Sequence, residues 1–538
     1  MIKIIAINSK FIHINSAVWY LHYSLKTNNI NSSVESYSIN DQYDNVLRGV
    51  LTSNPNIVCF SSYIWNIEYI LKLVNDIKNI NSNIKIILGG PEVSFDSEQV
   101  LKNNAIDLII RGEGENVISQ IIKGDTSYGC AFIKDGKYID NGYAIVKDLN
   151  DIPFIFTEEV LGVEKNKIMY YESSRGCPYN CIYCLSSTLN GVRYLDIERV
   201  FKELLILSQS DIKQIKFVDR TFNLNEKRSV AILKYINGLK CDINFHLEIY
   251  PASLSQKTME CLLEMKKGRV QIEAGIQSTN KKTLDYSKRF QDSTKALNNI
   301  KKIIVNGNIH VHLDLIAGLP YEDKSLFIKS FNETIETRPH MLQLGFLKLL
   351  RGTKAREIEG YVAQNLAPYE ILKTPWLSFN DMSEIKLVEY TLNMFYNTNK
   401  FIKIMKYMLD RSENAYMLFL NIAKYINVQY EKDHKLSEFD KYEILFKISD
   451  EEKIIKELLR FDYMATHKSK SMPYFLNDED KIKDKIFKYF MKQNMNAKTM
   501  YKNTNISIFH FKQETTYLFD YREVNRVTKV FKYKKIKL

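Results

Sequence analysis

The chain has 538 residues, of which 45% are hydrophobic and 26% charged. This composition is typical of folded globular proteins, excludes disordered and fibrous classes, and allows about three or four domains. The net charge is +12, and only seven cysteines in so long a chain exclude a disulfide-stapled scaffold and favour a reducing compartment. No apolar stretch reaches the roughly 18 residues of a membrane span, and residues 1–8 show no signal-peptide cleavage site, so we expect a cytoplasmic protein.

The first part of the chain alternates short β-branched runs with amphipathic segments. This alternation predicts an α/β fold with a parallel sheet covered by helices, in a Rossmann-like or flavodoxin-like domain over residues 1–150. The expected strands are 2–7, 33–37, 57–61, 84–88 and 107–111, and the expected helices lie near 17–28, 43–53, 67–80, 97–103 and 115–122. Ligands bind such sheets beyond the carboxyl ends of the strands.

Small and acidic residues follow three of these strands. Glycines at such positions let a bulky ligand approach the backbone, and helix amino termini favour anionic groups. We therefore expect this edge to contact a ligand, although each element also fits a simple strand-to-helix turn. The expected contacts are Ser61, Ser62, Gly89, Gly90, Pro91, Glu92, Gly112, Glu113, Gly114 and Glu115.

A strand pair around 131–145 leads into a second strand–helix series over about 160–360. Its expected strands are 168–173, 213–219, 244–249, 270–277, 310–317 and 342–349. Such repeats predict a partial (β/α)6 barrel with its active site at the carboxyl ends of the strands. Polar residues interrupt these ends: Asp219, Arg220, Glu248, Glu273, Gln277, Asp314 and Lys348. A buried carboxylate needs a partner, which is either a bound ligand or a lysine or arginine inside the barrel.

Three cysteines, Cys177, Cys181 and Cys184, lie within one short loop after the first barrel strand. Their thiolates can converge on one soft metal centre, but structural zinc and a fully ligated iron-sulfur cluster both need four protein ligands. The spacing therefore predicts a metal centre with one open site. A zinc site completed by a distant His or Cys, and a buried reduced trio without function, are the alternatives. The other cysteines, Cys59, Cys130, Cys241 and Cys261, are interpreted as core residues.

The cysteine loop, with Pro178 after the first cysteine and Tyr183 before the last, resembles the radical S-adenosylmethionine (SAM) superfamily. The resemblance implies a 4Fe-4S cluster on the three cysteines, a free iron that chelates SAM, and reductive cleavage of SAM to a 5′-deoxyadenosyl radical. It also implies a flavodoxin- or ferredoxin-type reductant, and places Tyr183 among the cofactor contacts.

Residues 168–350 are similar to the coproporphyrinogen-dehydrogenase-like branch of that superfamily. In His246-Leu-Glu248-Ile and Gly275-Ile-Gln277-Ser, the resemblance implies that Glu248 and Gln277 contact SAM. It implies that Asp314 contacts the ribose and that Arg289 pairs with the SAM carboxylate. These roles are physically sensible, because carboxylates accept hydrogen bonds from hydroxyl groups and arginine clamps a carboxylate with two parallel bonds.

The Gly89-Gly90-Pro91-Glu92 and Arg111-Gly-Glu-Gly-Glu115 elements resemble the cobalamin-binding domain that precedes many radical SAM cores. The resemblance implies cobalamin as a third cofactor. The Asp-x-His-x-x-Gly element that supplies a histidine ligand to cobalt in cobalamin-dependent mutases is absent, because His13 lacks the flanking Asp and Gly. We therefore expect cobalamin to bind without a histidine ligand and His13 to be a polar loop contact.

The last third, residues 361–538, carries helical patterns near 382–396, 400–408, 415–425, 451–459 and 481–490. We expect a mainly helical domain, which could cap the barrel mouth. The segment resembles the carboxyl-terminal region of cobalamin-binding radical SAM proteins with an uncharacterised, DUF4080-like domain. Four lysines in the last eight residues are interpreted as a solvated surface, so we do not expect nucleic acid as a partner.

Taken together, the resemblances imply a cobalamin-dependent radical SAM enzyme that methylates an unactivated carbon of an unknown substrate. Radical cyclisation or rearrangement is an alternative reaction. RNA methylthiolation is another, but it needs a second cysteine trio in the first domain, which Cys59 and Cys130 cannot form. An alternative from a different class is a non-catalytic sensor that binds cobalamin or SAM.

Overall fold

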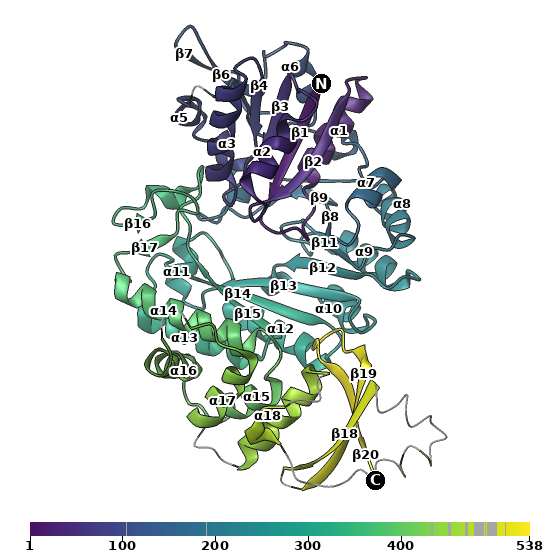
Figure 1. Ribbon diagram of the computed structural model, residues 1–538, viewed down its shortest axis with the longest axis vertical. Helices are drawn as coiled ribbons and strands as arrows, with labels where there is room; N and C mark the ends of the chain where they lie inside the picture. Colours follow the sequence, from purple (N-terminus) through teal and green to yellow (C-terminus); the bar gives the residue numbers. More distant parts are fainter. Residues whose placement is uncertain are drawn as a thin grey trace.

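The computed structural model describes residues 1–103, 105–189, 191–431, 434–449, 453–468, 472–477, 489, 491, 503–511 and 513–537. Figure 1 shows three parts along the long axis of the molecule. The amino-terminal sheet lies at one end, a second sheet lies in the middle, and helices followed by a small sheet lie at the other end. Within the residues that the structure describes, none of the helices is long and apolar enough to span a membrane.

The first sheet has seven strands in the order β2-β1-β3-β4-β5-β6-β7. Its strands are β1 (Ile2–Asn8), β2 (Ser32–Ser38), β3 (Ile57–Ser61), β4 (Lys85–Gly89), β5 (Leu108–Ile110), β6 (Cys130–Lys134) and β7 (Lys137–Asp140). β1 to β5 are parallel, whereas β6 and β7 join in antiparallel pairs. The order 2-1-3-4-5 is that of a flavodoxin-like sheet, so the predicted fold of this domain is confirmed.

Helices cover both faces of this sheet. Successive side chains of a strand point to opposite faces, and in β1 the side chains on both faces are buried. Ile4 belongs to the core cluster that includes residues of α1 and α6, while Ile5 belongs to the cluster that includes residues of α2, α3 and α5. The helices are α1 (Ser16–Thr27), α2 (Tyr43–Leu51), α3 (Ile67–Ile80), α4 (Pro91–Ser94), α5 (Ser97–Leu101) and α6 (Ile118–Ile122). The loops that follow the carboxyl ends of these strands form the edge at which a ligand is expected, and this edge is called the ligand edge below.

The middle sheet has six parallel strands in the order β15-β14-β13-β12-β11-β8. The strands are β8 (Met169–Tyr171), β11 (Gln214–Phe217), β12 (Asn244–Ile249), β13 (Val270–Gln277), β14 (His310–Ala317) and β15 (Met341–Phe346). The helices are α7 (Glu158–Val163), α8 (Ile197–Ser208), α9 (Glu226–Gly238), α10 (Gln256–Leu263), α11 (Lys281–Tyr286), α12 (Ser293–Asn306) and α13 (Lys324–Glu336). Among the strands described, β8 and β15 form the two edges and do not pair, so the barrel is partial, as predicted.

The carboxyl-terminal part begins as a helical bundle beside β15, as predicted. Its helices are α14 (Phe379–Thr391), a π-helical turn at Leu392–Tyr396, α15 (Ile402–Leu409), α16 (Ala415–Gln429), α17 (Glu438–Ile448) and α18 (Lys453–Thr466). α14 and α17 each start with a capping box, formed by Ser378 with Asp381 and by Ser437 with Asp440. The helix expected at 481–490 lies outside the described residues, apart from residue 489.

A three-stranded antiparallel sheet follows, which the helical patterns did not predict. It consists of β18 (Thr504–His510), β19 (Glu514–Val524) and β20 (Phe531–Ile536). The turn after β19 contacts the amino end of β14, where His310 Nδ1 lies 2.6 Å from the Val527 carbonyl oxygen. This sheet therefore lies at the end of the barrel opposite to its mouth. It does not form the expected cap over the mouth.

Candidate functional site

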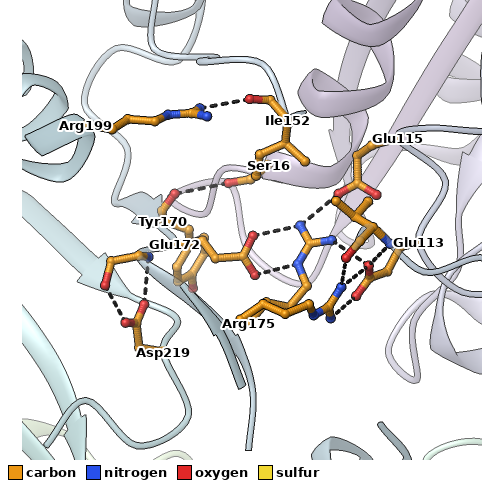
Figure 2. Close-up of polar contacts among 12 residues, drawn as sticks. Ser16, Glu113, Glu115, Ile152, Tyr170, Glu172, Arg175, Arg199 and Asp219 are labelled. Carbon is orange, nitrogen blue, oxygen red and sulfur yellow. Dashed lines mark hydrogen bonds and ion pairs between the residues drawn. The ribbon is translucent and has the colours of Figure 1, made fainter. Parts of the chain in front are cut away.

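The cysteine loop is anchored to the barrel by one buried carboxylate. Asp219, which follows β11, accepts hydrogen bonds from the Ser173 backbone N–H (2.8 Å), the Ser173 hydroxyl (2.6 Å) and the Ser174 hydroxyl (2.7 Å). Figure 2 shows this anchor below the ion pairs of the loop. Burial raises the pKa of Asp219, and the three donors oppose that shift. Asp219 thus fixes the start of the loop at the carboxyl end of β8.

A glycine is required immediately before the first cysteine. Gly176 ends the short strand β9 (Ser174–Gly176), which pairs with β10 (Val192–Tyr194), and its φ is +103°. A Cβ atom at this position would lie 2.3 Å from the Gly191 carbonyl oxygen. Because L-residues rarely adopt this conformation, a side chain here would displace the loop.

The other side of the cysteine loop docks on two segments of the barrel. The Ile182 N–H donates to the Ser287 carbonyl (3.1 Å), and the Ala355 N–H donates to the Ile182 carbonyl (3.0 Å). Cys181 is buried, whereas Cys177 and Cys184 are half-buried. Burial raises the pKa of the Cys181 thiol. Of the remaining cysteines, Cys59 and Cys130 are buried as predicted, while Cys241 and Cys261 are half-buried.

Arg289 is half-buried beside this loop, and among the described residues it has no acidic partner. Its guanidinium lies 4.8 Å from the centre of the Tyr250 ring and donates to the Gly275 carbonyl oxygen (2.6 Å). Its Nε is buried and lacks a hydrogen-bond partner, and no ion pair to Arg289 occurs in the described part of the chain. A buried guanidinium of this kind is stabilised by an anion. The site therefore fits a ligand with a carboxylate, such as SAM.

Two further polar side chains near Arg289 are unsatisfied. Gln277 has a positive φ of +69° at a bulge between β13 and β14, and its Oε1 is buried without a partner. The Tyr183 hydroxyl is also buried without a partner. Strained backbone and unpaired polar atoms cluster at ligand sites, because a bound molecule satisfies them.

Inside the barrel, three acids expected at the strand ends contact basic side chains that the sequence analysis did not name. Lys216 Nζ lies 2.9 Å from Glu273 and 3.2 Å from Glu248, and His312 Nε2 lies 3.0 Å from Asp314 Oδ1. Burial alone would lower the pKa of Lys216, but the two carboxylates outweigh burial and raise it. Glu248 therefore has a lysine partner within the barrel, which was the alternative to a bound ligand. Asp314 pairs with a histidine instead of a lysine or arginine.

A cavity of about 700 Å³ lies between the ligand edge of the first sheet and the barrel mouth. Nine expected contacts line it: Ser61, Gly89, Gly90, Pro91, Gly112, Glu113, Gly114, Glu115 and Glu248. Ser62, Glu92, Tyr183, Gln277, Arg289 and Asp314 are not among its lining residues. The Glu92 carboxylate instead accepts a hydrogen bond from the Tyr369 hydroxyl (3.0 Å) and lies 3.5 Å from Arg351 Nε.

The glycines of the ligand edge leave no room for side chains. Gly90 and Gly112 have φ values of +109° and +88°, and a Cβ on them would lie 2.5 Å from Ser62 O and 2.3 Å from Ala144 O. Gly90 and Gly112 are therefore required by close contacts with neighbouring backbone, and their contact with a ligand stays a prediction. Residues that sequence reasoning did not propose also line the cavity: Tyr20, Tyr63, Trp65, Tyr143, Tyr170, Arg175 and Lys216.

Glu113 and Glu115, which were expected to contact a ligand, pair with arginines of the barrel domain. Arg193 donates two hydrogen bonds to Glu113, at 2.6 and 2.7 Å, and the Val146 N–H donates a third at 2.6 Å. Burial alone would raise the pKa of Glu113, but Arg193, Arg175 and the Val146 N–H together lower it. Figure 2 shows the two carboxylates facing Arg175 across the domain boundary.

Family models match three successive parts of the chain. The B12 binding domain matches residues 2–122, the Radical SAM superfamily matches residues 171–333, and a protein family of unknown function (DUF4080) matches residues 359–535. The chain joins a B12-binding, a radical SAM and a DUF4080 domain. The combination implied by the cysteine loop and the glycine-rich edge is thereby confirmed.

Characterised and uncharacterised methyltransferases are among the relatives of this B12-binding radical SAM chain. It is 30% identical over 270 residues to the "Uncharacterized methyltransferase PH0819" of Pyrococcus horikoshii, covering 46% of this chain and 57% of the relative. It is 20% identical over 367 residues to the "Cobalamin-dependent radical SAM methyltransferase TokK" of Streptomyces tokunonensis, covering 63% and 54%. The chain thus spans little more than half the length of these relatives.

One solved structure extends the likeness over most of the fold. The cobalamin-dependent S-adenosylmethionine radical enzyme OxsB with aqua-cobalamin bound aligns with a TM-score of 0.59 at 16% identity. The alignment covers 86% of this chain and 78% of that chain. At this identity the likeness confirms the arrangement of the first sheet and the partial barrel.

Proposed function

We propose that this chain is a cobalamin-dependent radical SAM enzyme, and that it transfers a methyl group to an unactivated carbon of its substrate. One observation carries the proposal. Residues on both sides of the cysteine trio, Arg175 and Gly176 before it and Leu185 after it, line the same cavity as the glycine-rich edge of the B12-binding domain. The names of the relatives support methyl transfer as the reaction class.

In this proposal Cys177, Cys181 and Cys184 are the ligands of a 4Fe-4S cluster. When bound, the cluster supplies the electron that cleaves SAM, and cobalamin supplies the methyl carrier. Arg289 holds the SAM carboxylate, because its buried Nε lacks a hydrogen-bond partner and its guanidinium has no acidic partner among the described residues. The chain's own residues bind and orient the cofactors and exclude water from the cavity.

The remaining polar side chains of the barrel mouth orient SAM in this proposal. Gln277 and Tyr183 offer buried polar atoms that lack partners. Asp314, whose Oδ1 lies 3.0 Å from His312 Nε2, offers its other carboxylate oxygen to the ribose. Glu248 lines the cavity and is held by Lys216. The three groups on β12, β13 and β14 thus come from neighbouring parallel strands, whose carboxyl ends meet at one edge.

For cobalamin, we propose that the ligand edge of the first sheet holds the corrin through its backbone. Ser61, Gly89, Gly90, Pro91, Gly112 and Gly114 line the cavity. Ser62 and Glu92 support that edge from behind, since the Ser62 N–H donates to the Gly89 carbonyl (2.7 Å) and Glu92 is held by Tyr369. Glu113 and Glu115 fix the edge to the barrel domain.

The proposal includes the following organisation. Residues 1–150 bind cobalamin, residues 160–360 form the radical SAM core, and residues 361–538 form the mainly helical domain with its terminal sheet. A flavodoxin- or ferredoxin-type protein supplies electrons, and nucleic acid is not a partner. An oxygen-sensitive cluster fits the reducing cytoplasm.

The test is the formation of 5′-deoxyadenosine by anaerobically reconstituted, chemically reduced protein supplied with SAM. We expect the product with wild-type protein, none with a variant in which Cys177, Cys181 and Cys184 are alanine, and full activity with the control Cys261→Ala. A wild-type protein with an intact cluster and no cleavage would refute the enzyme and favour a sensor. In extracts of the producing cells, a protein-dependent gain of one methyl group supports methylation, whereas a loss of two hydrogens favours cyclisation.

A further inference from the structure

His13 lies where the first domain, the barrel and the cavity meet. It belongs to the loop between β1 and α1, at the ligand edge of the first sheet, and it is the only histidine among the described residues that line the cavity. His22, in α1 of the same domain, does not line it, and its Nδ1 lies 2.9 Å from the Ser32 hydroxyl. In the described part of the chain, His13 is therefore the one imidazole that could contact a ligand in this cavity.

The ring of His13 is held by a tyrosine from the other domain. Tyr170 of β8 places its hydroxyl 2.7 Å from His13 Nδ1, and the two rings stack with centroids 5.8 Å apart and planes inclined by 16°. The backbone is fixed as well, because the Ile168 N–H donates to the Ile12 carbonyl (2.8 Å). Lys167 Nζ lies 4.9 Å from the Phe11 ring centre. The loop is thus pinned to the start of β8.

In this arrangement one nitrogen of the His13 ring has a hydrogen-bond partner, and the other remains available to a ligand. Nδ1 is engaged with Tyr170, and among the residues that the structure describes no hydrogen bond to Nε2 is found. A histidine that binds a metal through one nitrogen usually donates its other N–H to an oriented oxygen partner. Tyr170 can be that partner when Nδ1 carries the proton.

We propose that His13 Nε2 is a ligand to the cobalt of the bound cobalamin, with Tyr170 as its positioning residue. This inference rests on the proposed function, since it requires cobalamin in the cavity. It differs from the expectation from sequence. There, the absence of the Asp-x-His-x-x-Gly element indicated that cobalamin binds without a histidine ligand. The oxygen partner of the imidazole comes from β8, 157 residues further along the chain, and not from a neighbouring aspartate.

The test is electron paramagnetic resonance of the full-length protein loaded with hydroxocobalamin and reduced to cob(II)alamin. Protein labelled with nitrogen-15 only at histidine is compared with unlabelled protein. A histidine ligand splits the cobalt lines into triplets in the unlabelled sample and into doublets in the labelled one. We expect this change in wild type and in the control His22→Ala, its loss in His13→Ala, and a smaller nitrogen-ligated fraction in Tyr170→Phe.

The remaining outcomes overturn the assignment in different ways. If the labelled sample also shows triplets, the nitrogen base of cobalamin itself is bound to the cobalt. If the lines show no nitrogen splitting, neither that base nor histidine is bound. Either result refutes the His13 ligand and leaves the proposed function intact. A wild-type protein that retains no cobalamin refutes the cobalamin site itself, and the His13 ligand with it.

Discussion

The guanidinium of Arg175 lies 2.8 Å from the carboxylate of Glu115, so a residue two positions before the first cysteine is paired with the ligand edge of the other domain. Arg175 also lies 2.7 Å from Glu172 and 3.4 Å from Glu113. These side chains are mostly buried, and Figure 2 shows them gathered around one guanidinium. The cysteine loop and the glycine-rich edge therefore share one charged anchor.

Removal of Arg175 should loosen this anchor. Arg175→Met leaves Glu115 and Glu172 close together without their cation, whereas Glu113 keeps its pair with Arg193. Breaking a buried charge cluster in this way costs about 3–5 kcal/mol. We expect a lower melting temperature and weaker retention of cobalamin on a sizing column. Arg522→Met, which breaks an exposed pair with Asp520, is the control and should leave the melting temperature close to that of wild type. Equal melting temperatures for the two variants would contradict this role of Arg175.

The cysteine loop should not tolerate a side chain at Gly176. In Gly176→Ala the new Cβ meets the Gly191 carbonyl at 2.3 Å, so Cys177 must shift from its place. We expect less iron than the about four atoms per chain of a reconstituted wild-type cluster. Gly162→Ala in α7 is the control, because no atom lies within 4 Å of its Cβ position. Full iron in Gly176→Ala would show that the loop adapts.

Asp314 should matter for SAM and not for the cluster. Asp314→Asn keeps the size of the side chain but removes its charge, and a lost hydrogen bond to a charged group costs about 1.5–3 kcal/mol. We expect the KM for SAM to rise by roughly 10- to 100-fold with unchanged iron content. The control is Asp242→Asn, whose exposed carboxylate pairs with Arg526. If Asp314→Asn cleaves SAM as wild type does, Asp314 has a structural role and does not bind SAM.

Glu322 should make the protein less stable as the pH rises. Burial raises the pKa of Glu322 from 4.5 to about 7, although the Ser278 and Ser330 hydroxyls oppose the shift. Between these pH values the folded protein keeps a proton that the unfolded chain releases, so roughly 3 kcal/mol of stability is lost as the pH rises through this window.

Glu322→Gln cannot titrate, and its melting temperature should fall less than that of wild type between pH 4.5 and pH 8. Glu336→Gln, at the exposed end of α13, serves as the control and should follow wild type. Parallel curves for Glu322→Gln and wild type would mean that the buried carboxyl group does not contribute to this pH dependence.

Most of the two parallel sheets was predictable, because β-branched runs separated by amphipathic helices allow few topologies. The terminal sheet was not predicted. Its last strand, β20 (Phe531–Ile536), has lysines at three of its positions, and these lysines were interpreted as a solvated surface. They lie on the edge strand of the small sheet, where lysines discourage pairing with other chains.

The candidate site was predictable where short spacing carries the signal, as in the cysteine loop and the Gly-Gly-Pro-Glu turn. Contacts between distant segments were not predictable. Glu92 meets Tyr369, which is 277 residues away, and Glu115 meets Arg175, which is 60 residues away. The sequence alone contains no record of such pairs, so it indicated these acids as ligand contacts without indicating the tyrosine and the arginine that hold them.

The central claim, that Cys177, Cys181 and Cys184 hold a cluster with one iron open to SAM, is tested most directly by electron paramagnetic resonance of the anaerobic, reduced protein. Our account predicts a signal of a reduced 4Fe-4S cluster that changes when SAM is added and is absent when the three cysteines are replaced by alanine. Zinc in place of iron, or a cluster signal that SAM leaves unchanged, would contradict it.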